Sequence, residues 1–262
     1  MRLWLRKMNW LLDYVLPGVR KGAPPNQASA DYSVLSRDAA TDGQFKSWHD
    51  HSVTERQDAA YRSLIQEMYA GQPRQDFLVA AEAVRYTGID EPFILEVGCG
   101  SGYYSEILTY LLDRSVRYLG LDYSAAMLQL ARKSYPEQLF VLGDARALPF
   151  DDGSLDVVMN GVSLMHILSY ETVIAEARRV AARWCIFHTV PVLRNRQTTF
   201  LQKRVYGKLG FEVIFNEAEL HQILEQRGLV VCQVLESVPY DLKRVVGEPT
   251  VTKTYVCEVK DG

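Results

Sequence analysis

A glycine-rich turn directly after an apolar run is the part of the sequence that points most clearly to chemistry. The run from Phe93 to Val97 contains Glu96 and continues into Gly98, Gly100 and Gly102 before an amphipathic stretch begins. Glycines at a strand-to-helix turn let the backbone bend sharply and approach a ligand closely. Their G-x-G-x-G spacing differs from the G-x-G-x-x-G of dinucleotide sites. The carboxylate of Glu96 would repel a pyrophosphate but suits a ligand with an ammonium group.

Two further carboxylates follow the next two apolar runs. Asp122 closes the run that begins at Arg117, and Asp144 lies in the Gly-Asp-Ala that follows Leu142. Open α/β sheets bind ligands at the carboxyl ends of their strands, where one acid can take both hydroxyls of a ribose and another can accept from an adenine amino group. Each acid alone also fits a helix cap or a turn. Together with the glycine turn, they predict a ligand that contains a nucleoside.

Short apolar runs alternate with amphipathic stretches through the middle of the chain, which predicts parallel strands with helical crossovers. We expect five strands, at residues 93–97, 117–121, 139–142, 155–159 and 183–190. Asn216 and Glu219 form a capping pair for a helix that stops at Gly228. The last two apolar runs, 229–235 and 252–259, are joined by a polar loop without a helix, so they predict an antiparallel terminal hairpin.

The chain before this alternation has a different pattern. Residues 1–16 mix Trp and Leu with basic residues and predict an amphipathic helix, which either docks on protein or lies in a membrane interface. Residues 18–31 are rich in Gly, Pro and Ala and predict a linker. Apolar residues at helical spacing between 44 and 87 predict helices interrupted at 71–73. The expected parts are a helix and linker (1–43), a helical lid or cap region (44–90) and an α/β domain (91–262).

Composition argues against several classes of protein. Hydrophobic residues make up 48% and charged residues 23% of the 262 positions, as in ordinary globular proteins, and no apolar run is long enough to span a membrane. A formal net charge of -3 offers no basic excess for nucleic acid. The four cysteines show no CxxC pair or zinc-type spacing, so we expect no metal and buried, reduced thiols in a cytoplasmic protein.

Four ordered pieces of the sequence resemble the class I S-adenosylmethionine-dependent methyltransferases. They are Glu96 to Gly102, Asp122, Gly143 to Ala145 ahead of a Leu-Pro-Phe turn, and the run Leu155 to Met159 followed by Asn160. The resemblance covers residues 93–190 and points to the broad group of small-molecule methyltransferases. It implies an α/β fold, a Rossmann-like three-layer sandwich whose seven-stranded, mostly parallel sheet ends in a C-terminal antiparallel hairpin, with an N-terminal helical extension.

The same resemblance implies which residues hold the cofactor S-adenosyl-L-methionine. Glu96 and Gly98 would hold its methionine end, and Asp122 its ribose. Met127 would cover a face of the adenine, and Asp144 with Ala145 would meet its edge. Asn160 and Gly161 would approach the methionine portion from the fourth strand. The full set implied is Glu96, Gly98, Gly100, Gly102, Asp122, Tyr123, Met127, Asp144, Ala145, Arg146, Asn160 and Gly161.

His166 is the candidate catalytic residue. Transfer of a methyl group to a hydroxyl requires positioning of the acceptor and removal of its proton. His166 comes just after the fourth strand, on the side where ligands bind, and imidazole titrates near neutral pH. A packing or hydrogen-bonding role at this junction is the alternative.

Other side chains are candidates for contacts with the acceptor. Tyr103, Trp48, His49 and His51 could line the cleft under an N-terminal lid, with ordinary packing as the alternative. Three basic groups could bind an anionic acceptor or form a solvated face: Arg178 with Arg179, Arg194 with Arg196, and Lys203 with Arg204.

The expected function is methyl transfer to a small-molecule or glycan-like acceptor. Asn160-Gly-Val-Ser differs from the Asn/Asp-Pro-Pro-aromatic run of amino-methylating enzymes, and no Lys-Asp-Lys-Glu constellation of ribose methylation stands out. Two alternatives remain: transfer of another part of the cofactor on the same fold, and a non-catalytic subunit that binds the cofactor. The methylated atom and the oligomeric state stay open, as does peripheral membrane contact through residues 1–16.

Overall fold

Five apolar runs form the parallel strands that the sequence predicts. They are β2 (Phe93–Val97), β3 (Arg117–Asp122), β4 (Leu139–Leu142), β5 (Leu155–Gly161) and β6 (Ala181–Leu193), in a computed structural model that describes residues 29–40, 45, 47–113 and 116–260. Their spatial order is β4, β3, β2, β5, β6, and each neighbouring pair is parallel. The direction of winding therefore reverses between β2 and β5, which is where open α/β sheets bind ligands.

The predicted terminal hairpin completes a seven-stranded, Rossmann-like sheet. Strand β10 (Val251–Val259) pairs antiparallel with both β6 and β9 (Leu229–Glu236). The connection between them differs from the prediction, because it contains the short helix α8 (Lys243–Val246). Side chains that hold this turn explain the difference: Asp241 accepts from the amide of Lys243 at 2.9 Å, and Thr250 accepts from the amide of Leu242 at 2.8 Å. A helix this short has no apolar period to reveal it.

In the part of the chain that the structure describes, three strands beyond these seven extend the sheet to ten. They are β1 (Ser29–Leu35), β7 (Thr199–Val205) and β8 (Lys208–Asn216), which pair antiparallel in that order, while β8 joins the end of β6 through two parallel residue pairs. The assignment of residues 1–43 to a helix and linker is therefore wrong for residues 29–35, and residues 1–28 lie outside the described residues. Strand β1 has a polar sequence and is stabilised by its distant partner β7.

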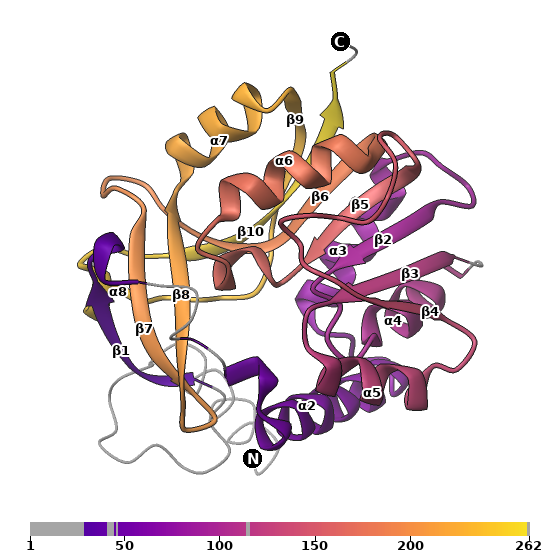
Figure 1. Cartoon of the computed structure of the whole chain (residues 1–262), viewed down its shortest axis with the longest axis horizontal. Helices are drawn as coiled ribbons and strands as arrows, with labels where there is room; N and C mark the ends of the chain where they lie inside the picture. The colour runs from indigo at the N-terminus through magenta and orange to yellow at the C-terminus, as the bar shows by residue number, and fades with distance from the viewer. Residues whose placement is uncertain (1–28, 41–44, 46, 114–115, 261–262) are drawn as a thin grey trace.

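Helices cover both faces of the sheet (Figure 1). One face carries α2 (His51–Tyr69), α3 (Gln75–Tyr86), α4 (Tyr103–Leu112) and α5 (Ala125–Ser134), and the other carries α6 (Tyr170–Val180) and α7 (Glu217–Gln226). Successive side chains of a strand point to opposite faces. Accordingly Ile94 and Met159 pack on the α2–α4 side, whereas Leu95 and Val158 pack beneath α6. This arrangement is the predicted three-layer sandwich.

All four cysteines have free thiols. Cys99, Cys185 and Cys257 are buried and Cys232 is half-buried, all as free thiols, and burial raises the pKa of Cys185 to about 12. Within the described ranges, no helix has the length and apolar character to cross a membrane, and no group of three or more His, Cys, Asp or Glu side chains is arranged to hold a metal.

Candidate cofactor and acceptor site

A cavity of about 350 Å³ opens at the carboxyl ends of β2, β3 and β5. This volume is within the range usual for small-molecule sites. Its walls come from the segment before and within α2, the glycine turn after β2, the residues after β3 and β4, and the turn after β5. The lining residues are Phe45, Trp48, His49, Gln57, Tyr61, Gly98, Gly100, Ser101, Tyr103, Leu121, Asp122, Tyr123, Met127, Gly143, Asp144, Ala145, Arg146, Gly161, Val162, Ser163, His166 and Ile167.

The glycine turn forms the floor of the cavity. Gly98 and Gly100 have φ of 75° and 54°, the left-handed region that favours glycine. A Cβ on Gly98 would overlap the side chain of Ser163, whereas a Cβ on Gly100 would project into open space, with the Met127 sulfur 3.9 Å away. The turn therefore leaves backbone accessible at Gly100. Gly102 does not line the cavity: it precedes α4, and its missing Cβ leaves room for the ring of Phe140.

Asp122 lies in the cavity wall with a carboxylate fixed by backbone donors. Oδ2 accepts from the amide of Gly100 at 2.8 Å and Oδ1 from the amide of Ser124 at 2.8 Å. Burial raises the pKa of Asp122, and these backbone hydrogen bonds oppose the rise. The carboxylate lines the cavity, and its contact with the ribose of a cofactor stays a prediction.

Glu96 lies beneath the cavity and does not line it. Its Oε2 accepts from the hydroxyl of Tyr118, and its Oε1 occupies the space that a Cβ on Gly161 would need. Burial raises the pKa of Glu96 well above its ordinary value, and the nearby charge of Asp122 adds to the rise. Glu96 therefore lies behind Gly161, and its pairing with a ligand ammonium stays a prediction.

Asn160 offers a buried hydrogen-bond donor next to the cavity. Its Oδ1 accepts from the hydroxyl of Ser163 at 3.0 Å, and its side chain is 1% exposed. Among the residues that the structure describes, its Nδ2 meets no acceptor. Buried amide groups are nearly always hydrogen-bonded, so an unpaired donor here fits a ligand with a carboxylate. Asn160 itself is outside the lining, which its neighbour Gly161 reaches.

The residues expected to surround an adenine all line the cavity. Met127 and Ala145 are buried and present apolar surface, while Tyr123 is 44% exposed at the rim. Asp144 pairs with Arg146, whose Nη2 lies 2.7 Å from Oδ2, and this partner lowers the pKa of the carboxyl group. The ion pair is exposed and therefore weak, so Asp144 retains the capacity to accept from an amino group.

His166 borders the cavity with a defined tautomer. Its Nδ1 lies 2.8 Å from the carbonyl oxygen of Phe211. A carbonyl oxygen only accepts, so Nδ1 carries the hydrogen and Nε2 keeps a lone pair. Burial lowers the pKa of His166 to about 4, and Lys203 contributes to the lowering, against the opposing effects of Glu212 and the Phe211 carbonyl. The imidazole is therefore neutral at physiological pH and can accept a proton at Nε2.

Aromatic side chains from the chain before β2 line the cavity. Trp48 lies 5.6 Å from His166 between ring centroids, and Tyr61 stacks on Tyr103 at 3.7 Å. Trp48, His49 and Tyr103 line the cavity as expected, whereas His51 begins α2 and is exposed. Phe45, Gln57, Tyr61, Ser163 and Ile167 are lining residues that the sequence did not identify. For Tyr61, helical spacing indicated only a buried face.

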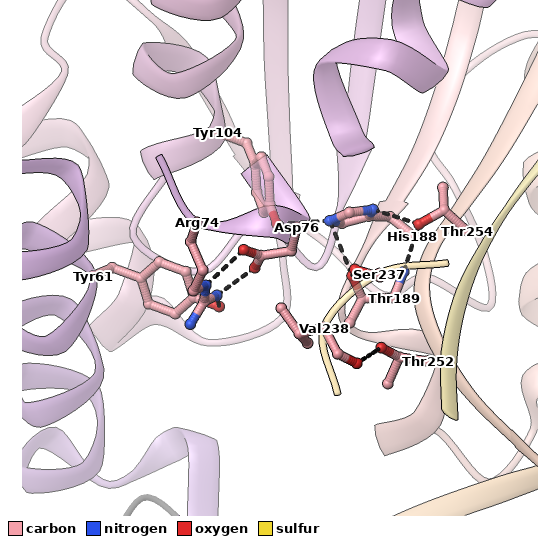
Figure 2. A network of polar contacts seen from close by, with 10 residues as sticks. All are labelled: Tyr61, Arg74, Asp76, Tyr104, His188, Thr189, Ser237, Val238, Thr252 and Thr254. Carbon is pink, nitrogen blue, oxygen red and sulfur yellow. Dashed lines mark hydrogen bonds and ion pairs between the residues drawn. The ribbon is translucent and has the colours of Figure 1, made fainter. Parts of the chain in front are cut away.

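A buried polar network that includes Arg74, Asp76 and His188 lies next to Tyr61 (Figure 2). The Nε of Arg74 donates to Asp76 at 2.6 Å, and the guanidinium lies 5.2 Å from the centre of the Tyr61 ring. Farther along the network, the Tyr104 hydroxyl and the His188 Nε2 are 2.8 Å apart. Burial lowers the pKa of His188 to about 4. The aromatic wall is thus anchored to the core of the molecule.

The basic groups lie elsewhere. None of the six residues lines the described cavity. Lys203 is 5% exposed and forms an ion pair with Glu212, so its assignment to a solvated face is wrong. Arg179 binds Glu176 and the carbonyl oxygens of Leu148 and Phe150, while Arg194 and Arg196 are exposed. An anionic acceptor therefore has no basic partner from these groups at the cavity.

The cavity fits S-adenosylmethionine at its glycine-turn half. Open backbone at Gly100, the Asp122 carboxylate and apolar Met127 match an amino acid joined to a nucleoside, and Asn160 lies behind the lining. The rings of Trp48, Tyr61 and Tyr103 line the same cavity and form what we call its aromatic half.

Sequence comparison shows similarity to methyltransferases. Residues 95–186 match the family model described as "Methyltransferase domain". A demethylmenaquinone methyltransferase of Lactococcus lactis is 38% identical over 92 residues, 33% of this chain and 36% of that protein. A probable S-adenosylmethionine-dependent methyltransferase of Mycolicibacterium smegmatis is 32% identical over 139 residues, 53% of this chain and 52% of that protein. The aligned region thus spans about a third to a half of these curated relatives.

Solved structures share the fold at low sequence identity. The cyclase SpnF superposes with a TM-score of 0.56 at 16% identity, covering 71% of this chain and 82% of that one. Magnesium protoporphyrin IX methyltransferase from Synechocystis PCC 6803 with bound SAH has a TM-score of 0.52 at 15% identity, with the same coverage of both chains. At these identities, the likeness establishes the Rossmann-like methyltransferase fold alone.

Proposed function

Because residues 95–186 form a methyltransferase domain of the class I, S-adenosylmethionine-dependent type, we propose that this chain transfers the methyl group of S-adenosylmethionine to a hydroxyl of a small, largely apolar, planar acceptor. One observation carries the proposal: a single cavity joins the glycine turn and Asp122 to an aromatic wall that contains His166. A cofactor site and an acceptor site that share one cavity are what methyl transfer requires.

The residues of the chain divide the work of the reaction. When bound, S-adenosylmethionine supplies a methyl group on a positively charged sulfur, which an acceptor oxygen attacks in line. The glycine turn and Asp122 hold the cofactor in one orientation, and orientation of two reactants can supply much of the rate enhancement. His166 accepts the hydroxyl proton at Nε2, while its Nδ1 remains bound to the Phe211 carbonyl. The aromatic wall excludes water and stacks on the acceptor.

The lining favours an acceptor with an apolar ring system over a glycan. Phe45, Trp48, Tyr61 and Tyr103 present ring surface on the acceptor side, and few polar side chains stand among them. Aromatic rings stack well on flat apolar molecules. Glycan recognition would need many more hydrogen-bonding groups to meet the hydroxyls. The name of the relative that acts on demethylmenaquinone supports the same class of acceptor.

Calorimetric titration with S-adenosylmethionine and S-adenosylhomocysteine tests the cofactor assignment. We expect both to bind the wild type and to bind Asp122→Ala about 10- to 100-fold more weakly, since a hydrogen bond to a charged group contributes about 1.5–3 kcal/mol. Exposed Asp151 offers the matched control Asp151→Ala, and NAD is the control ligand. No binding of either sulfur compound to folded wild type would refute the proposal.

A panel of acceptors then tests catalysis, with S-adenosylhomocysteine formation as the readout. Naphthols and naphthoquinols are expected to be methylated, and simple sugars are not. Cofactor binding without turnover of any phenolic acceptor would favour the non-catalytic alternative. His166→Gln should lower the rate about 100-fold or more with little change in cofactor affinity, as expected for loss of a general base.

We also propose that residues 1–16 contact a membrane, which would give the chain access to apolar acceptors. These residues lie outside the described residues, so the proposal depends on their mix of Trp, Leu and basic side chains. Liposome sedimentation and oligomer size, compared between the full chain and a variant without residues 1–22, separate membrane contact from self-association. Equal sedimentation of both would refute it.

A further inference from the structure

Gln57 places an amide group in the aromatic half of the cavity, which we call the acceptor half because the proposed acceptor binds there. It belongs to α2, is half-buried and lines the cavity. Its Oε1 accepts from the hydroxyl of Tyr206 at 3.1 Å. Among the described residues, the Gln57 amide nitrogen meets no protein acceptor. A primary amide has two N–H donors, so both remain for a ligand or solvent.

The β7–β8 hairpin fixes the position of this amide. Tyr206 and Gly207 form its two-residue turn with φ of 47° and 87°, values that fit the type I′ turn typical of tight hairpins. Next to the turn, Lys208 lies 2.9 Å from Asp50, which caps α2 by accepting from the amide of Ser52. The hairpin therefore holds the start of α2 through two polar contacts, one of them to Gln57.

His166 and Gln57 have different hydrogen-bonding character. His166 presents a lone pair at Nε2, which accepts from a hydroxyl. Gln57 has two N–H donors without a protein partner among the described residues, and a carbonyl oxygen is an acceptor for such donors. A hydroxyl satisfies the first group and a carbonyl satisfies the second. A planar apolar body between the aromatic side chains can carry both.

We propose that Gln57 is a specificity-determining residue that selects acceptors with a carbonyl oxygen in addition to the hydroxyl that is methylated. The substrate class is then a hydroxyaryl ketone or a similar hydroxylated, carbonyl-bearing ring. This inference rests on the proposed methyl transfer, because it assumes that the aromatic half of the cavity holds the acceptor.

A matched pair of fluorescent probes tests the proposal without knowledge of the natural acceptor. An acetylnaphthol and the ethylnaphthol of the same substitution pattern differ only in that a carbonyl replaces a methylene. Binding of each is measured by fluorescence anisotropy with saturating S-adenosylhomocysteine. We expect the wild type to prefer the acetyl compound about 5-fold, the ratio for one net hydrogen bond.

Three variants separate recognition from a structural role. Gln57→Glu keeps an oxygen for the Tyr206 hydroxyl but has no N–H donor, so the preference should disappear while the fold is retained. Gln57→Leu should also lose it. Gln66→Leu, on an exposed position of the same helix, should keep it. Tyr206→Phe, which frees the amide to rotate, should reduce the preference without abolishing it.

The outcomes distinguish this inference from the proposed function. If the wild type does not bind S-adenosylhomocysteine in calorimetry, the proposed function fails and the inference fails with it. If S-adenosylhomocysteine binds but the wild type shows no preference for the acetyl probe, only the role of Gln57 is overturned. A preference that survives in Gln57→Glu overturns it as well. Equal thermal unfolding midpoints of the variants exclude loss of fold as the cause.

Discussion

Removal of the Trp48 ring should raise the pKa of His166 towards that of a free histidine. Burial is the main cause that lowers the pKa of His166 to about 4, and Trp48 encloses the imidazole on the cavity side, with 5.6 Å between ring centroids. Trp48→Ala would open that side to water and so stabilise the protonated form. We therefore expect the titration midpoint to move up, towards about 6.5.

The size of the effect follows from the two limiting pKa values. At pH 5.5, a group with a pKa of about 4 is protonated in about 3% of molecules, and one with the ordinary value of about 6.5 in about 90%. Even a rise of one unit makes about a quarter of the molecules protonated at that pH. The variant and the wild type thus differ most between pH 5 and 6.

Nitrogen-15 chemical shifts of the imidazole rings measure both the midpoint and the tautomer. The chain has five histidines, and His166→Gln assigns the signal of interest. The wild type should show hydrogen on Nδ1 down to about pH 5. His188 is an internal control, because it is 1% exposed and its pKa of about 4 depends on its own burial, so Trp48→Ala should leave it unchanged.

A wild-type midpoint near 6.5 would refute this reasoning, since His166 would then be solvated. Hydrogen on Nε2 in the neutral form would remove His166 as the base, because the lone pair would point at the Phe211 carbonyl. An unchanged midpoint in Trp48→Ala would show that Trp48 does not desolvate the ring.

Three further predictions concern stability, measured by urea unfolding. Gly98→Ala should lower the free energy of unfolding by about 2–5 kcal/mol, of which about 1–2 comes from the left-handed backbone and about 1–3 from overlap with Ser163. A double variant with Ser163→Gly should recover the part due to overlap. Strictly additive effects of the two substitutions would contradict this packing. The pKa of His188 is about 4 in the folded state and about 6.5 in the unfolded state, so the unfolded state takes up the proton first as the pH falls. The free energy of unfolding is therefore highest above about pH 6.5 and lower by about 2 kcal/mol at pH 5. His188→Gln should make this pH dependence weaker. Lys203→Met should lower the free energy of unfolding by about 3–5 kcal/mol, because the buried Glu212 carboxylate loses its cation. The double variant with Glu212→Leu should lower it much less. Equal losses in the two variants would contradict the role of the ion pair.

Local signals account for the parts of the fold that the sequence predicts correctly. Alternating apolar runs locate the five parallel strands, because a strand buried on both faces needs a continuous apolar run. The capping pair at Asn216 is confirmed, with its side chain accepting from the Glu219 amide at 3.0 Å. The short helix α8 and strand β1 are the elements that local patterns miss, since side-chain hydrogen bonds hold one and a distant strand pairs with the other.

The candidate site likewise contains residues that local sequence patterns identify and residues whose surroundings depend on packing. Gly98, Gly100 and Asp122 follow strands at the switch point of the sheet, so sequence spacing alone predicts that they meet. The roles of Glu96 and Lys203 depend on burial beside particular partners, Tyr118 and Glu212, which lie on other strands. Whether a charged residue is exposed or paired is a property of the packed interior, so the sequence alone could not give the surroundings of these two residues.

By itself, the sequence determined the class of fold and the end of the sheet where a nucleoside-containing cofactor fits, because strand periodicity and a glycine turn are encoded by neighbouring residues. Only the tertiary structure showed which residues form the acceptor half of the cavity. Tyr61 and Gln57 look like ordinary helix residues until α2 packs beside α4, and the β7–β8 hairpin reaches Gln57 from residue 206. Contacts between segments far apart in the chain depend on how whole elements pack, and no local pattern records them.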